Sequence, residues 1–149
     1  MTPIPDPEPL VLERTFNATV TRVWTALTQL DAIRQWFFHL PAFESRVGFD
    51  FGFTVECEGQ KVVNQCRITE VVPESRLAFT WRYEGVEGES TITYELFAEG
   101  DKTRLKFTQT GLETFPKEPQ FSRASFLEGW NWLVNESLKN HLEGPIPTP

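Results

Sequence analysis

Residues 49 to 109 alternate between apolar and polar side chains with a period of two, and one long helical pattern follows near the end of the chain. Strands with this period have one apolar and one polar face, so the sheet that they form must have its apolar face covered. The only element long enough to lie across that face is the amphipathic stretch at about 121–142. The order predicts a curved sheet wrapped round a terminal helix.

Five strands can be placed within the alternating region. Turn-forming stretches at 58–61, 85–88 and 99–102 separate them, and Pro73 ends the second strand, so they form an antiparallel meander. Their inward residues are predicted to be Phe49, Phe51, Phe53 and Val55, then Leu77, Phe79, Trp81 and Tyr83, then Ile92, Tyr94 and Leu96, then Leu105, Phe107 and Gln109. One face of the sheet is therefore lined with aromatic rings.

A strand and two short helices precede the meander. Residues 10–16 read as a first strand, and a helix beginning near Thr19 follows it, with apolar residues at three- and four-residue spacing. We expect Asp31 to cap a second helix that carries Trp36 and ends before Pro41. The final helix is expected to bury a stripe of Leu127, Trp130, Leu133, Val134, Leu138 and Leu142.

Length and charge limit the organisation and the partners. The 149 residues suit one domain over 10–143, with proline-rich tails at 1–9 and 144–149. A net charge of -7 with no basic run argues against nucleic acid and anionic membranes, and no transmembrane or secretory segment is visible. We therefore expect a cytoplasmic protein, whose Cys57 and Cys66 are too few for a disulfide framework.

Several segments together resemble a known superfamily. RTFNA at 14–18, VWTALT at 23–28, Trp36 with Phe37, PESRLAFTW at 73–81 and GW at 129–130 are similar to the SRPBCC (START and birch-pollen-allergen-like) superfamily, nearest to its branch named for the activator of heat-shock-protein-90 ATPase homologue. The resemblance covers about 10–142. It implies an α+β helix-grip fold, with six or seven antiparallel strands round the C-terminal helix and a hydrophobic cavity between them. Members of this superfamily bind lipids, sterols, polyketides and other apolar molecules.

The candidate ligand-binding residues are those predicted to face this cavity. Any one aromatic among them is more often a packing residue than a ligand contact. Tyr83, Tyr94 and Trp130 stand out because each carries a polar atom inward, and Gln109 could contact a ligand or only satisfy the backbone. The full set is Trp36, Phe51, Phe53, Phe79, Trp81, Tyr83, Tyr94, Phe107, Gln109, Trp130 and Val134.

Catalytic and metal sites have little support in the sequence. His39 and His141 lack a second ligand at a metal spacing, and no nucleotide, hydrolase or metalloprotease motif is present. We predict no catalytic residue, no metal and no cofactor.

Three functions remain open. The first is non-enzymatic binding of a small hydrophobic molecule, lipid-like or aromatic, in the cavity. The second is a co-chaperone-like interaction module acting on a chaperone ATPase, which would connect the chain to the stress response. The third is a cyclase- or hydratase-type enzyme that uses a cavity tyrosine as general acid. Exposed sheet edges would permit either a monomer or a homodimer.

Overall fold

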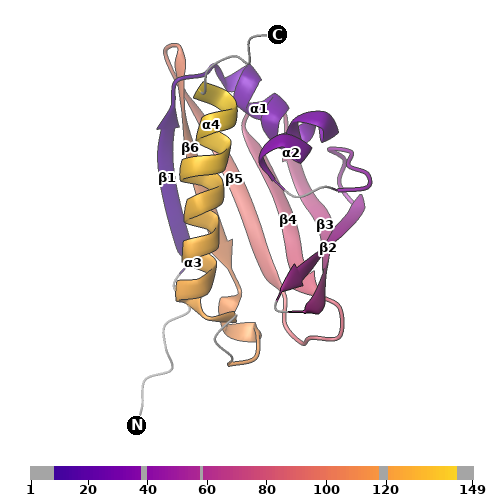
Figure 1. Cartoon of the computed structure of the whole chain (residues 1–149). Helices are drawn as coiled ribbons and strands as arrows, with labels where there is room; N and C mark the ends of the chain where they lie inside the picture. The colour runs from indigo at the N-terminus through magenta and orange to yellow at the C-terminus, as the bar shows by residue number, and fades with distance from the viewer. Residues whose placement is uncertain (1–8, 38–39, 58, 118–120, 144–149) are drawn as a thin grey trace.

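The computed structural model describes residues 9–37, 40–57, 59–117 and 121–143, and shows one curved sheet with a long helix across its inner face (Figure 1). Six antiparallel strands form the sheet, in the order β1-β6-β5-β4-β3-β2. The strands are β1 (Leu10–Phe16), β2 (Asp50–Cys57), β3 (Gln60–Val72), β4 (Arg76–Tyr83), β5 (Ser90–Glu99) and β6 (Lys102–Thr110). The predicted α+β helix-grip fold is confirmed, with six strands.

The registers place the predicted inward residues on one face. Tyr94 of β5 lies opposite Phe107 of β6, and Phe79 of β4 lies opposite Ile92 of β5. These four side chains are buried because directly opposed residues of antiparallel strands point to the same side. The first strand does not pair with the second: β1 pairs with β6, from Leu10 opposite Gln109 to Phe16 opposite Thr103.

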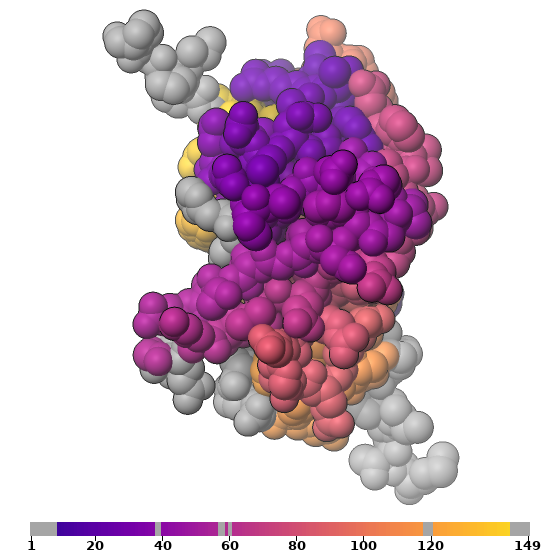
Figure 2. Space-filling view, turned by 90° about the vertical axis from the view of Figure 1, so that its right-hand side faces the viewer, coloured from indigo at the N-terminus to yellow at the C-terminus, as the bar shows by residue number. Residues whose placement is uncertain are grey.

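The sheet is bent on its β2 side. The register of β3 against β4 shifts between Ile68 and Glu70, which is the two-against-one pattern of a β-bulge. A bulge bends its strand and increases the local twist. Figure 2 shows the β2–β3 hairpin, in magenta, projecting from the body on the side where the C-terminal helix, in yellow, comes into view. This curvature makes the inner face of the sheet concave.

Two short helices follow β1. Helix α1 (Val20–Thr28) is capped by Thr19, whose hydroxyl accepts a hydrogen bond of 3.3 Å from the backbone N–H of Arg22. Helix α2 (Leu30–Trp36) begins two residues earlier than expected, with Gln29 at the cap, so the prediction that Asp31 caps it is wrong. Asp31 instead lies in the first turn, where a carboxylate is favoured by the helix dipole.

The C-terminal helix is continuous but not uniform. It consists of α3 (Arg123–Trp132), the π-helical segment η3 (Leu133–Leu138) and α4 (Lys139–Glu143), and Ser122 caps its start. Trp130, Leu133, Val134, Leu138 and Leu142 are buried as predicted. The expectation for Leu127 is wrong, because Phe126 takes the inward position and Leu127 is exposed.

The π segment explains how the buried stripe continues. Trp130, Val134, Leu138 and Leu142 recur every four residues, whereas an α-helix turns every 3.6, so such a stripe drifts round a regular helix. The wider turn in η3 accommodates the extra residue and returns Leu138 and Leu142 to the sheet side.

Some predictions lie outside the described residues. These are the tail segments 1–8 and 144–149 and the residue His39. Within the described part, no helix is long and apolar enough to cross a membrane. A short 3₁₀ turn, η1 (Leu112–Thr114), follows β6 and leads toward the start of α3.

Candidate functional site

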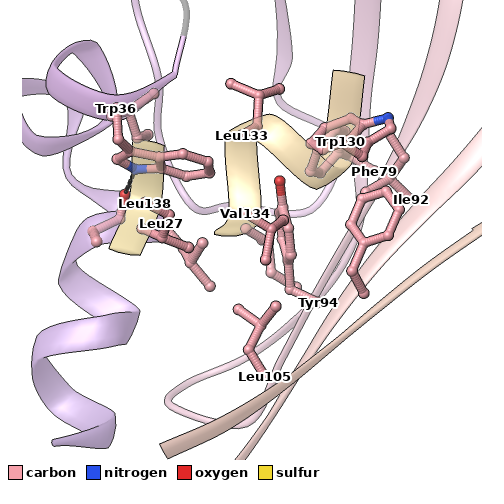
Figure 3. Close-up of a cluster of buried hydrophobic side chains, with 14 of the residues drawn as sticks. Leu27, Trp36, Phe79, Ile92, Tyr94, Leu105, Trp130, Leu133, Val134 and Leu138 are labelled. Carbon is pink, nitrogen blue, oxygen red and sulfur yellow. Dashed lines mark hydrogen bonds between the residues drawn. The ribbon is translucent and has the colours of Figure 1, made fainter. Parts of the chain in front are cut away.

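The space between the sheet and the C-terminal helix is filled with aromatic rings. Trp130 of α3 is the centre of this group: its ring centroid lies 4.5 Å from Phe107, 5.4 Å from Trp81 and 5.9 Å from Phe37. Figure 3 shows Trp130 and Val134 of the helix beside Phe79, Ile92 and Tyr94 of the sheet. Elements from both ends of the chain thus meet in one core.

All eleven residues predicted to face the cavity lie in this interior. Ten are buried, and Tyr83 is half-buried near the end of β4. Their inward position follows from the strand period and the helical stripe. Their role as ligand contacts stays a prediction.

The interior holds much less empty space than a ligand cavity would. Between α2 and the sheet lies a void of about 20 Å³, which is little more than the space of one water molecule. It is lined by Leu27, Ile33, Trp36, Phe37, Leu40, Phe43, Phe51, Leu77, Phe79 and Tyr94. In this conformation the protein's own side chains occupy the expected cavity.

Phe37 separates this void from a much larger groove outside. The groove, of about 840 Å³, runs between α2 and α3 and is lined by Phe37, Trp36, Gly129, Leu133 and neighbouring polar residues. Phe37 is the C-cap residue of α2, with an extended backbone, and its ring stacks on Trp130 and meets Phe53 edge-on at 5.7 Å. Phe37 therefore borders both the void and the groove, as does Trp36, whose indole N–H donates a hydrogen bond of 2.7 Å to the carbonyl of Ala26.

Among the described residues that line the void, Tyr94 provides the one hydroxyl. Its side chain is buried, and its hydroxyl points toward the C-terminal helix near Val134 (Figure 3). Burial raises the pKa of Tyr94 well above its ordinary value, because a phenolate would lose its hydration there. The hydroxyl is thus protonated near neutral pH and can donate a hydrogen bond.

Comparison with known proteins agrees with this architecture. The family model described as activator of Hsp90 ATPase homolog 1-like protein matches residues 17–143. The chain belongs to this family. None of the curated proteins matches it.

Several solved structures are similar to this family member over most of its length. The Mll3558 protein of Rhizobium loti has a TM-score of 0.79 and 25% identity, over 91% of this chain and 96% of that one. Protein MLL2253 of Mesorhizobium loti has a TM-score of 0.73 and 26% identity, over 91% and 97%. DynU16, described as a protein in the dynemicin biosynthetic locus, has a TM-score of 0.75 and 27% identity, and this chain spans 48% of its length.

The other polar groups of this activator-homologue domain offer no reactive centre near the void. The indole N–H of Trp81 donates a hydrogen bond of 2.9 Å to the hydroxyl of Tyr83. Burial raises the pKa of the Cys66 thiol to about 12, so this free cysteine is a poor nucleophile at neutral pH. Among the described residues, no group of His, Cys, Asp and Glu is arranged to hold a metal ion.

Sequence reasoning missed two features of this domain. Phe37 was assigned to the second helix and not to the site, since an aromatic after a helix has no strand phase to show its direction. A second hollow of about 880 Å³ lies against β2, β3 and β4 and is lined in part by Asp50, Arg67, Arg82 and Glu89. These charges are exposed and paired as Asp50–Arg67 and Arg82–Glu89, so we do not assign the ligand site there.

Proposed function

We propose that the protein binds a small apolar molecule in the interior between the sheet and the C-terminal helix, with Phe37 as the movable side chain that admits it. The observation that carries this proposal is the position of Phe37, which lines both the void of about 20 Å³ and the groove of about 840 Å³. A ligand needs more room than the void supplies. Rotation of the Phe37 ring into the groove would free the volume of one aromatic ring.

The side chains that line the void determine which kind of ligand can bind there. Among the described residues, these side chains are apolar except for the Tyr94 hydroxyl and the Trp36 indole N–H, which already donates to the carbonyl of Ala26. A bound molecule therefore gains about 25 cal/mol for each Å² of apolar surface that it buries. A protonated Tyr94 donates but holds no charge, which favours a ligand with one acceptor oxygen. We therefore propose an aromatic or alicyclic molecule with a single carbonyl or ether group.

The same features weigh against the enzymatic alternative. A general acid works best with a pKa near the working pH, and burial moves the pKa of Tyr94 in the opposite direction. The proposed role is therefore binding, transport or presentation of the molecule, without covalent chemistry.

One observation favours the interaction module as a second candidate. Trp132 is 59% exposed on the outer side of α3, and exposed tryptophans often provide binding energy at protein interfaces. A chaperone ATPase that binds the wild-type protein and not Trp132→Ala would support this alternative.

The binding proposal is tested through Gly129, which lines the groove and whose added Cβ would meet no atom within 4 Å. The probe is 2-acetylnaphthalene, followed by the indole N–H signals of Trp36, Trp81 and Trp130 in nitrogen–proton correlation spectra. We expect Gly129→Ala to bind as the wild type does. Gly129→Phe fills the groove, so Phe37 has no place to turn and affinity should fall about tenfold or more.

Two results would contradict the proposal. If the probe moves no interior indole signal and native mass spectrometry of gently purified protein shows no small-molecule adduct, interior binding is wrong. If Gly129→Phe and Gly129→Ala bind equally well, the access route past Phe37 is wrong.

A further inference from the structure

The interior has a second end, which is polar. Gln109 of β6 and Ser90 of β5 are both 0% exposed. Neither amide atom of Gln109 nor the hydroxyl of Ser90 has a hydrogen-bond partner among the residues that the structure describes. Buried polar groups of folded proteins are nearly always paired, because an unpaired group loses its hydrogen bonds to water and gains none. Three such atoms in one place indicate a missing partner.

The register brings these two side chains together. Gln109 lies opposite Ile92, and Ser90 stands two residues before Ile92 on the same strand. Alternate residues of a strand share a face, so Ser90 and Gln109 are diagonal neighbours on the inner face, at a typical spacing of about 7–8 Å with their Cβ atoms somewhat closer. That separation leaves room for one small polar group between them.

The polar end is adjacent to the rings that surround Phe37. Ser90 lies opposite Trp81 on β4, and Gln109 follows Phe107, against which Trp130 packs. Trp81 and Trp130 are also the rings that contact Phe37. A ligand ring in the place of Phe37 would therefore lie one side chain away from Ser90, through Trp81, and on the same face of the sheet as Gln109.

We propose that Gln109 and Ser90 bind the polar end of the ligand, and that this end is an uncharged group with a donor beside an acceptor, such as a carboxamide or a lactam. The inference rests on the proposed binding of an apolar molecule. An amide pairs with both atoms of Gln109 at once, since its carbonyl accepts from Nε2 and its N–H donates to Oε1. The Ser90 hydroxyl donates a further bond to the same carbonyl. Both residues are neutral, so a carboxylate would be buried here without a compensating charge.

The test compares two probes of the same shape and the same number of heavy atoms. In 2-acetylnaphthalene the polar group offers only an acceptor, whereas 2-naphthamide offers an acceptor and a donor. Both carry one carbonyl acceptor in the same position, so their difference reports the donor. We expect the wild-type protein to bind 2-naphthamide about tenfold more tightly, and the side-chain NH₂ signal of Gln109 to shift on binding.

The test variant is Gln109→Met and its matched control is Gln65→Met, both made in the full chain. Gln109→Met keeps the length of the side chain and removes its polar atoms, while Gln65→Met makes the same change at an exposed site on the outer face. The preference for the amide should reverse in Gln109→Met and persist in Gln65→Met. Ser90→Ala should reduce the preference without reversing it.

Three other results would overturn the inference, each for a different reason. If 2-acetylnaphthalene binds and Gln109→Met leaves the ratio of the two affinities unchanged, the polar atoms do not meet the ligand, although the proposed function stands. If Gln109→Met also lowers the melting temperature, the missing partner is a structural water. If neither probe moves the indole signal of Trp130, interior binding fails and this inference fails with it. By contrast, a higher melting temperature of ligand-free Gln109→Met supports the inference, because the unpaired atoms are then a cost in the empty protein.

Discussion

The ring of Trp130 lies 4.5 Å from the ring of Phe107, measured between centroids, and this contact attaches the C-terminal helix to β6. Both side chains are almost completely buried, at 2% and 0% exposure. The contact joins a residue near the end of the chain to a strand that is itself held by β1 and β5. Trp130 therefore links the two layers of the fold directly.

Replacement of Trp130 by Ala is expected to lower the free energy of unfolding by about 3–5 kcal/mol, since it removes a large buried ring and leaves a cavity. Trp132→Ala provides the matched control, because Trp132 is 59% exposed two residues away and its loss should cost about 0.5 kcal/mol or less. Urea denaturation of both variants measures the difference. Equal losses would show that the helix is not anchored through Trp130.

Gly129→Ala is expected to raise the free energy of unfolding by about 0.5–1 kcal/mol, because alanine favours the helix and the added methyl group meets no atom within 4 Å. Gly88→Ala should have the opposite effect. Gly88 has a φ of +108°, and a Cβ there would lie 2.5 Å from the carbonyl oxygen of Thr114. Thermal melts of the pair check both signs, and a destabilising Gly129→Ala would contradict the open groove.

Alkaline pH should reduce stability through Cys66. Burial raises the pKa of its thiol to about 12 in the folded protein, whereas an exposed thiol in the unfolded chain has a pKa of about 8.5. Above pH 8.5 the unfolded state releases this proton first, so the stabilisation is complete below that pH and is lost as the pH rises toward 12.

The measurement for this prediction is the free energy of unfolding between pH 8 and 11, for a Cys57→Ser background with and without Cys66→Ala. The stability of the Cys66-containing protein should decline more steeply as pH rises. Parallel slopes would mean that the thiol is accessible to water. Ellman's reagent should react slowly with Cys66 at pH 8 unless urea is added.

Ser137→Ala should loosen the wall of the groove. The hydroxyl of Ser137, in the π segment, donates a hydrogen bond of 2.6 Å to the backbone carbonyl of Trp36, next to Phe37. Loss of this bond is expected to cost about 0.5–1.5 kcal/mol. Hydrogen exchange at the Phe37 amide, which donates to the carbonyl of Ile33 over 2.8 Å, should become faster. The exposed Ser45→Ala is the control, and unchanged exchange in Ser137→Ala would refute the coupling.

Periodicity was sufficient to predict most of the fold. The first strand agrees with its predicted bounds at Leu10 and Phe16, and turns at 85–88 and 99–102 separate the later strands. The cap of α2 was misplaced because Asp31 is a good capping residue at a position where the backbone had already become helical. The π segment could not be predicted, since it depends on how the whole helix fits the sheet.

Strand alternation could not predict how the interior between the sheet and the helix is filled. Alternation predicts which way Phe51 or Tyr94 points, but not how completely their rings fill the space. That filling depends on Phe37, which comes from a helix end, and on the curvature introduced by the bulge in β3. Ser90 was not selected because a small polar residue at the start of a strand usually belongs to the turn.

The pairing of β1 with β6 has a consequence for folding during translation. Residues 10–16 are synthesised before the meander begins, yet their partner strand at 103–109 is the last strand of the meander. Contacts between such distant segments form slowly, because a long loop must close before they contribute any stability. During translation the apolar face of the meander is therefore without both its closing strand and its covering helix, and this interval is when the chain is most vulnerable to aggregation.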